Sequence, residues 1–474
     1  MTFRPAASGH YRANPLPGTK EAILNSSTDV VIVGARCAGA PLAVLLAREG
    51  VEVTVVEQVE FPRDTLSTHI FEADALAFLD RLGLAERLRE TGAPFVRRVD
   101  NRTEDLHVVL DWPQEPGDIG GLAAIRRFVL DPILADTAKE AGAEMHMGTK
   151  VTGLLEDSGR VGGVRVSGPS GEAELRARLV VAADGRNSTV ARLCGSRKYN
   201  LTSNERALYY GYFEGAEPGP DPTFVFHRWA NRLVLGCPAD SGLYLALVLP
   251  EAAELDRFKG DRERSFMEHV LSCEPVARAV RGAKRVGKLQ GAVRWEGFFR
   301  EPSGPGWVLT GDAGHFKDPT AGRGIGDAFG QTEALAPVIA NGLRASNDAL
   351  DHALGDWGRW RDDDYAEHYW FATEMGRGGT LTAVTPEFAR RLHERGQLQQ
   401  LLDIQNHRVK PSQVLTPARL VGTVARLMTR RDGHRGQVLR DTGSLLARQL
   451  RYRWLTRRPA YAGTGGDAGP TEVE

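Results

Sequence analysis

The sequence is poor in cysteine and in net charge, and each shortage excludes a class of protein. The four cysteines, at positions 37, 194, 237 and 273, have no paired spacing, which argues against a disulfide framework or a zinc site. We therefore expect no metal. A formal charge of −1 over 474 residues gives no global field for nucleic acid, and no such partner is expected.

Apolar runs are also short. No stretch approaches the ~20 apolar residues of a membrane span, so we expect no spanning helix. Residues 1–28 are rich in Pro, Ser and Asn, which argues against a secretory signal there and favours a flexible arm. Together with the unpaired cysteines, these features favour a cytoplasmic protein.

After the N-terminal arm, the pattern of apolar residues predicts a strand, a helix and a second strand. Residues 30–33 and 51–56 are apolar, β-branched runs that predict buried parallel strands. Between them, residues 41–49 predict a helix with Pro41 in its first turn and Gly50 as its left-handed cap. This order is typical of a nucleotide-binding unit, in which helix amides hold a pyrophosphate.

The turn of this unit carries Gly34 and Gly39, and Glu57 ends its second strand. Glu57 lies 18 residues after Gly39, where a carboxylate accepts hydrogen bonds from ribose hydroxyls. The fingerprint expects glycine where Arg36 stands. Arg36 either points away from the turn or adds positive charge beside a phosphate, and the alternative is a turn that binds no nucleotide.

Two later motifs also follow predicted buried strands. Residues 179–183 lead into Asp184-Gly185, and residues 307–310 lead into Gly311-Asp312. A carboxylate at such a strand end accepts hydrogen bonds from sugar hydroxyls, and its removal leaves buried donors unpaired.

A glycine-rich turn follows the third motif and opens a predicted helix at Asp327. Its glycines allow backbone amides and the positive helix end to approach a ligand closely. The turn carries Pro319, Gly322, Gly324 and Gly326.

In this order the three motifs resemble the FAD-dependent monooxygenase superfamily of the para-hydroxybenzoate hydroxylase type, which includes geranylgeranyl-reductase-like flavoproteins and halogenases. The resemblance covers residues 28–345. It implies an α/β fold: a Rossmann-like FAD-binding domain with an inserted antiparallel-sheet substrate domain and a helical C-terminal extension. It also implies FAD as cofactor and NAD(P)H as reductant.

The resemblance assigns cofactor contacts residue by residue. The first motif would hold the ADP moiety, Arg127 and the second motif would lie at the pyrophosphate, and the third motif would bind the ribityl chain and the ring. The residues expected to bind FAD are Gly34, Arg36, Gly39, Glu57, Arg127, Asp184, Gly185, Asp312, Pro319, Gly322 and Gly324. Catalytic residues are not identified; His69 and His315 are the candidates, and the alternatives are a solvated side chain on a polar loop for His69 and a structural, hydrogen-bonding histidine for His315.

Two departures bear on the reaction. Gly326 stands where hydroxylases of the family carry Asn, a form also shared with reductase-like and halogenase-like members. The halogenase signature of two tryptophans followed by Ile-Pro is absent, so halogenation is not expected.

An inserted sheet is predicted from four apolar or alternating runs separated by turn residues, at 207–213, 223–229, 233–237 and 243–249. Its aromatic residues could wall an apolar substrate pocket, but alternation should place about half of them behind the sheet. They are Tyr209, Tyr210, Tyr212, Phe224, Phe226 and Trp229.

We expect six regions along the chain. They are an arm (1–28), the first part of the FAD-binding domain (29–200), the substrate domain (201–300), the last part of the FAD-binding domain (301–345), a helical C-terminal region (346–460) and a disordered tail (461–474). Residues 408–458 hold 13 Lys/Arg and two Asp/Glu. This excess suits either an acidic partner or anionic lipid, or a solvated helical appendage, which we favour.

The leading hypothesis is an FAD-dependent, NAD(P)H-consuming monooxygenase that inserts one oxygen atom of O2 into a small apolar or aromatic organic substrate through a C4a-(hydro)peroxyflavin. The first alternative is an FAD-dependent reductase of carbon–carbon double bonds. The second is a non-catalytic flavin-fold binding protein. The sequence names neither the substrate, nor NADH or NADPH, nor the oligomeric state.

Overall fold

The computed structural model describes residues 26–67, 69–430 and 435–457. The first strand begins at Ser26, within the segment assigned to the arm. The rest of that arm and the tail expected at 461–474 lie outside the described residues. None of the described helices is long and apolar enough to cross a membrane.

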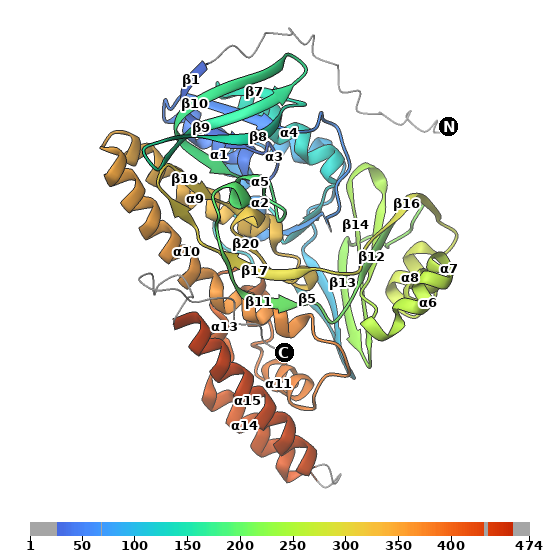
Figure 1. The fold of residues 1–474 in the computed structure, drawn as a ribbon. Coiled ribbons are helices and arrows are strands. Elements are labelled where there is room, and N and C mark those ends of the chain that lie inside the picture. Colours follow the sequence, from blue (N-terminus) through green and yellow to red (C-terminus); the bar gives the residue numbers. More distant parts are fainter. Residues whose placement is uncertain (1–25, 68, 431–434, 458–474) are drawn as a thin grey trace, which may run out of the picture.

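An eight-stranded sheet with a parallel centre forms the part of the chain that is expected to bind FAD (Figure 1). The strand order is β18-β19-β10-β1-β2-β7, and β9 joins β8 to β10 in an antiparallel extension. The central strand β1 runs parallel to both neighbours, with Val30 opposite Leu179 and Val53. The strands are β1 Ser26–Val33, β2 Val53–Glu57, β7 Glu144–Met147, β8 Lys150–Asp157, β9 Arg160–Gly168, β10 Gly171–Ala182, β18 Ser303–Gly304 and β19 Trp307–Leu309.

Helices cover this sheet and bury an apolar layer against it. The layer joins side chains of β1, α1, α2, α4, α9 and α10. Helix α1 begins at Gly39, two residues before the predicted start, because Pro41 is tolerated inside a first turn. Helix α9 likewise begins at Gly324 and not at Asp327. The helices are α1 Gly39–Arg48, α2 Ala73–Arg81, α3 Ala85–Glu90, α4 Arg127–Glu140, α5 Thr189–Leu193 and α9 Gly324–Leu343.

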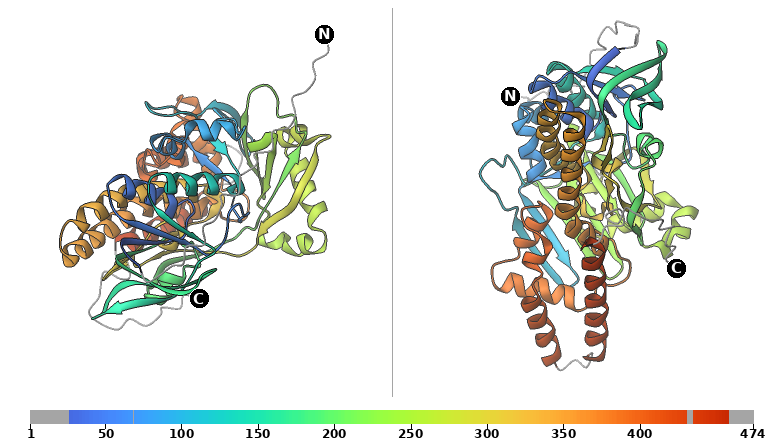
Figure 2. Two further views of the ribbon diagram at one scale, coloured as in Figure 1. Left: turned by 90° about the horizontal axis from the view of Figure 1, so that it is seen from above. Right: turned by 60° about the vertical axis from the view of Figure 1, so that its left-hand side comes forward.

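A seven-stranded sheet carries the predicted substrate region, and we call it the substrate sheet. Its strand order is β16-β12-β15-β14-β13-β4-β5. The four predicted strands are present as β12 to β15, and three helices pack on the outer face (Figure 2). Three strands that the sequence did not predict, β4, β5 and β16, extend it, and β4 pairs with β13 in parallel. The elements are β4 Arg98–Thr103, β5 Leu106–Asp111, β12 Leu208–Glu214, β13 Thr223–Trp229, β14 Arg232–Pro238, β15 Tyr244–Val248, β16 Lys284–Ala292, α6 Leu255–Gly260, α7 Arg262–Leu271 and α8 Glu274–Val280.

Short elements and a helical C-terminal region complete the fold. Helix α11 packs against β5, so this region is attached to the substrate sheet. The remaining strands are β3 Ile70–Glu72, β6 Leu122–Ala124, β11 Lys198–Ser203, β17 Glu296–Arg300 and β20 His315–Phe316. The remaining helices are α10 Asn347–Met375, α11 Val384–Glu394, α12 Gln400–Gln405, α13 Pro411–Val414, α14 Pro417–Thr429 and α15 Arg435–Arg457.

Candidate flavin site

The three motifs meet where the central strands end. Gly34 follows β1 with φ +104°, and a Cβ there would lie 2.5 Å from the carbonyl oxygen of Ala183. Gly311 has φ +57°, and its Cβ would lie 2.9 Å from the Cβ of Ala38. Glycine at these two positions therefore lets the second and third motifs touch the first.

The turn after β1 is held by Glu57. One carboxylate oxygen of Glu57 accepts a hydrogen bond from the Ala35 amide at 3.0 Å, and the other accepts from the Val59 amide at 3.2 Å. Glu57 is 4% exposed. Each oxygen keeps a second lone pair, so the predicted contact with ribose hydroxyls is compatible with these bonds.

Arg36 reaches helix α4, and its Nε also lies 4.0 Å from Oε2 of Glu57, which holds the turn. Its Nη1 donates to Asp131 Oδ2 at 2.6 Å, and its guanidinium lies 5.1 Å from the centre of the Phe61 ring. Asp131 also accepts from Arg127 Nε at 2.5 Å through its other oxygen. One fully buried carboxylate thus positions two guanidiniums. The sequence did not predict this role for Asp131.

Arg127 is available for a phosphate. It is the first residue of α4, and its two terminal nitrogens have no hydrogen bond among the described residues. Guanidinium nitrogens in this arrangement match phosphate oxygens. The donor set at this place therefore fits the diphosphate of FAD.

The two motif aspartates are incompletely paired. Asp184 Oδ2 accepts from the Thr189 amide at 2.7 Å, whereas its buried Oδ1 has no partner among the described residues. Asp312 is half-buried and accepts no hydrogen bond within the described part of the chain. Burial raises the pKa of Asp312 to about 6, although the charge of Arg127 opposes the rise. Carboxylates in this state fit the hydroxyl donors of a sugar or ribityl chain.

The glycine-rich turn adjoins Asp312. The turn begins at Pro319, and Gly322 has φ +71°. A Cβ on the exposed Gly324 would lie 3.9 Å from Asp312 Oδ1, which places the start of α9 beside that carboxylate. Gly185, in contrast, has φ +79° with open space around it, so only its backbone conformation favours glycine.

A buried ionic network that the sequence did not predict lies at the start of α9. Lys317 Nζ is 2.6 Å from Asp327, and Arg323 binds Asp74 at 2.6 Å and Glu72 at 3.1 Å. Burial raises the pKa of Glu72 to about 8, although the charge of Arg323 opposes the rise. Burial also lowers the pKa of Lys317, although the charge of Asp327 opposes that shift.

The C-terminal region supplies two histidines to this network. His407 Nε2 lies 3.2 Å from Lys317 Nζ, and the His368 ring centre lies 3.7 Å from that of His407. Burial lowers the pKa of both histidines, and that of His368 to about 2. Both rings are therefore neutral near pH 7.

The two predicted histidines lie in different surroundings. His69 is buried between Tyr210 and Tyr212, with ring centres 5.6 and 6.0 Å away, and its Nδ1 accepts from the Arg127 amide at 3.3 Å. It therefore adjoins the motif residues. His315 packs against Phe299, Tyr365 and Tyr369, and its Nδ1 lies 3.4 Å from the Gln331 amide nitrogen. Burial lowers the pKa of both histidines well below the usual range.

The aromatic residues of the substrate sheet divide between its two faces. Tyr210, Tyr212, Phe224 and Phe226 face β3, β6 and β20 of the FAD-binding part, and we call these four the aromatic wall. Tyr209 and Trp229 instead pack under helices α6 to α8, as the alternation predicted. The wall carries one buried hydroxyl, on Tyr212, that has no partner among the described residues.

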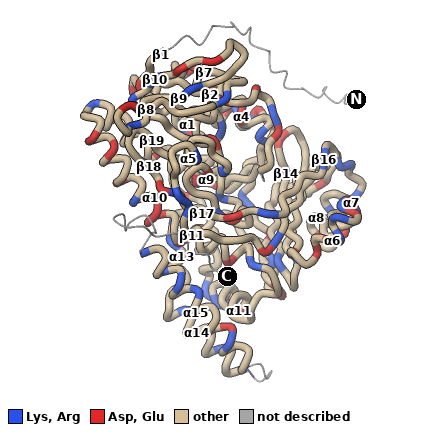
Figure 3. Tube along the Cα trace, viewed as in Figure 1, with Lys and Arg blue, Asp and Glu red and all other residues tan. Residues whose placement is uncertain are grey.

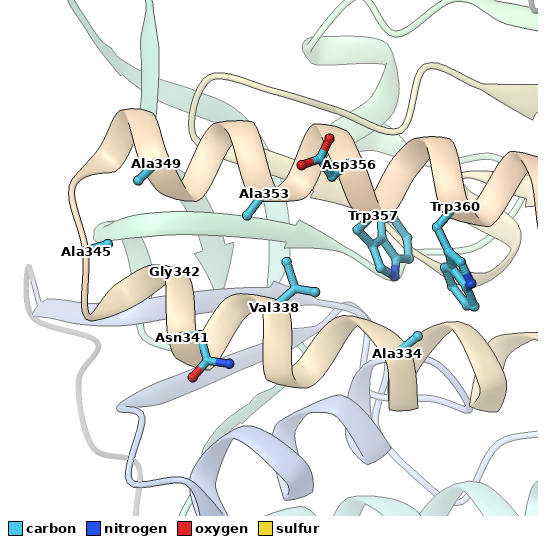
Figure 4. A pocket seen from close by; sticks show the side chains of 10 residues that line it. All are labelled: Ala334, Val338, Asn341, Gly342, Ala345, Ala349, Ala353, Asp356, Trp357 and Trp360. Carbon is cyan, nitrogen blue, oxygen red and sulfur yellow. The ribbon is translucent and has the colours of Figure 1, made fainter.

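Two other features lie apart from the motifs. A groove of about 680 Å³ runs between α9 and α10, lined by small side chains and by Trp357 and Trp360 (Figure 4). On the substrate sheet, the Nε2 atoms of His107 and His227 lie 2.6 and 2.7 Å from Asp100 Oδ1. These three residues offer metal-ligating atoms, but hydrogen bonds among themselves already satisfy those atoms.

Comparison with known proteins points to one family. Residues 27–209 match the FAD binding domain family. The chain is 28% identical over 328 residues to 6-methylpretetramide 4-monooxygenase of Streptomyces rimosus, covering 67% of this chain and 76% of that protein. It is 28% identical over 330 residues to menaquinone reductase of Mycolicibacterium smegmatis, covering 67% and 78%. The solved structure of a flavin-dependent brominase shares the fold, with a TM-score of 0.67, 20% identity and coverage of 85% of this chain and 99% of that one.

Proposed function

Because the chain belongs to the FAD-dependent monooxygenase superfamily of the para-hydroxybenzoate hydroxylase type and is an FAD-dependent oxidoreductase, we propose that it inserts one oxygen atom of O2 into a small apolar or aromatic substrate. NAD(P)H serves as the reductant. FAD, when bound, supplies electron transfer from NAD(P)H and the activation of O2. The protein supplies the binding, orientation and proton contacts described next.

The aromatic wall and two unpaired donors, Tyr212 on the wall and His69 beside it, carry this proposal. Since His69 Nδ1 accepts from the Arg127 amide, the neutral ring holds its proton on Nε2, which is buried without a partner. The Tyr212 hydroxyl is the second such donor. A flat substrate with ring oxygens would stack on the wall and satisfy both donors, whereas a plain hydrocarbon would leave them unpaired.

The start of α9 supplies the electrostatics. Lys317 is buried near Asp312, and Arg323 is the buried residue that directly precedes the positive end of α9. Because Glu72, Asp74 and Asp327 counter the charges of these two residues, the end of the helix is the source of positive potential that would stabilise an electron-rich ligand ring. The network also fills the space behind the turn, which excludes water from that side.

A reductase of carbon–carbon double bonds is the second candidate, since a quinone ring would satisfy the same two donors and one relative is a menaquinone reductase. Oxygen uptake distinguishes the two reactions. With substituted phenols in air, we expect NAD(P)H oxidation and O2 consumption to rise together in equal amounts. Turnover of a short-chain menaquinone under anaerobic conditions, without O2 uptake in air, would contradict the monooxygenase.

The wall is tested in the same assay. Phe226→Ala should raise the KM for an aromatic substrate by about 10-fold, because an apolar contact of the pocket is lost. Tyr209→Phe is the matched control, since Tyr209 lies on the opposite face of the sheet. Equal effects of the two substitutions would contradict the assignment of the wall.

A further inference from the structure

The last helix, α15, presents an apolar stripe to solvent. Leu439, Leu446, Leu450 and Trp454 are between 51% and 66% exposed. Their spacing of seven, four and four residues places them on one face of the helix. Large apolar side chains gathered in this way mark an interaction surface, whereas scattered ones would not.

The opposite face of α15 is used for packing. The Tyr452 ring stacks on Trp370 of α10 with centres 4.3 Å apart, and its hydroxyl donates to Glu374 at 2.7 Å. Arg448 also binds Glu374, at 2.8 Å. These contacts fix the rotation of the helix and keep the stripe turned outward.

Arginines of α15 border the stripe and, in contrast to those at the end of α14, lack partners. At the end of the neighbouring helix α14, Arg426 and the C-cap Arg430 bind Glu387 at 2.9 and 2.7 Å. On α15, five exposed arginines make no ion pair or hydrogen bond within the described residues; they are Arg435, Arg440, Arg451, Arg453 and Arg457. The helix holds six arginines and a single acidic residue, Asp441. Lys and Arg positions recur along α14 and α15 (Figure 3).

We propose that α15 docks this protein on an anionic lipid membrane. The stripe would enter the interface between headgroups and acyl chains, and the arginines would contact lipid phosphates. A helix that presents one apolar stripe to solvent forms a convex surface. A deformable lipid surface can cover such a stripe, whereas a protein partner would need a groove to receive it. A second copy of the chain is disfavoured, because pairing two such helices would bring arginines together.

Vesicle flotation of the full-length, FAD-loaded protein tests the proposal. Vesicles of equal parts phosphatidylcholine and phosphatidylglycerol should carry the protein, and vesicles of phosphatidylcholine alone should not. Binding should weaken as salt is added, because exposed charges are screened. Replacing Arg451, Arg453 and Arg457 by Gln should weaken binding about 100-fold, at a factor of about 5 for each arginine.

Apolar insertion is tested separately with the double variant L450E/W454E, which should lose binding to the mixed vesicles. Leu271→Glu is the matched control, since Leu271 on α7 is 57% exposed but lies outside the stripe. FAD content and the thermal midpoint verify that each variant is folded. The proposal is overturned if the wild-type protein stays with the unbound fraction, if L450E/W454E floats like wild type, or if light scattering shows a dimer that this variant dissociates.

Discussion

Single glycines decide how closely the three motifs approach one another. At Gly34 the backbone is left-handed and the neighbouring carbonyl of Ala183 occupies the place of a Cβ. Gly50 has a similar φ of +78° but open space around it. Substitutions at these two positions therefore separate the energetic cost of backbone conformation from the cost of a close contact.

Gly34→Ala should destabilise the protein by about 3 kcal/mol or more, combining the cost of positive φ with that of a clash in a packed site. Gly50→Ala should cost about 1 kcal/mol, from conformation alone. Urea unfolding of both variants measures the difference. Equal losses would show that the motifs are not in contact at Gly34.

Asp312 is a motif carboxylate whose pKa is raised by burial. Its folded pKa of about 6 lies above the ordinary value of 3.8, so the unfolded chain is ionised at a lower pH than the folded chain. The apo protein therefore loses stability as pH rises from about 4 to 6, and the loss remains above pH 6.

Asp312→Asn removes that penalty. We expect the apo variant to be more stable than apo wild type by about 2 kcal/mol above pH 6, with the difference vanishing below pH 4. The same variant should bind FAD at least about 10-fold more weakly, since it loses a charged acceptor. Thermal unfolding across pH and FAD titration measure both effects. A variant less stable than wild type at pH 7 would contradict the unpaired carboxylate.

At the scale of elements, periodicity predicted the buried strands and the division of aromatic residues between the faces of β12 and β13. It failed for β4, because Arg-Val-Asp-Asn-Arg-Thr has one fully buried residue, Val99, and reads as a polar loop. Strand β5 does alternate, but its inward residues pack on α11, which follows hundreds of residues later. No local pattern announces such a partner.

The C-terminal region is joined to the substrate sheet through α11, which precedes the basic segment of residues 408–458. Phe388 of α11 is buried with Leu392 against the apolar side chains of β5. Phe388→Ala should therefore destabilise the protein by about 3 to 4 kcal/mol. Val421→Ala on α14, where the side chain is 69% exposed, should change stability by less than about 0.5 kcal/mol. Denaturant midpoints with unchanged slopes would measure both.

Across the whole molecule, the site assembles because the carboxyl ends of parallel strands meet at one edge of a sheet. That rule brings Gly34, Asp184 and Asp312 together although they are far apart in sequence, and it made these residues predictable. The network of Lys317, Arg323 and His407 was not predictable, since it depends on how the C-terminal region folds back on α9. Long-range packing of this kind leaves no motif.

The most direct test of the proposed reaction is the mass of the product formed under ¹⁸O2. FAD-loaded enzyme, NAD(P)H and a panel of phenols and quinones would be incubated in the labelled gas, and each product would be weighed by mass spectrometry. The monooxygenase predicts a product heavier than its substrate by a single ¹⁸O atom. A product that gains no label and gains two hydrogens at a former carbon–carbon double bond would contradict it and establish the reductase.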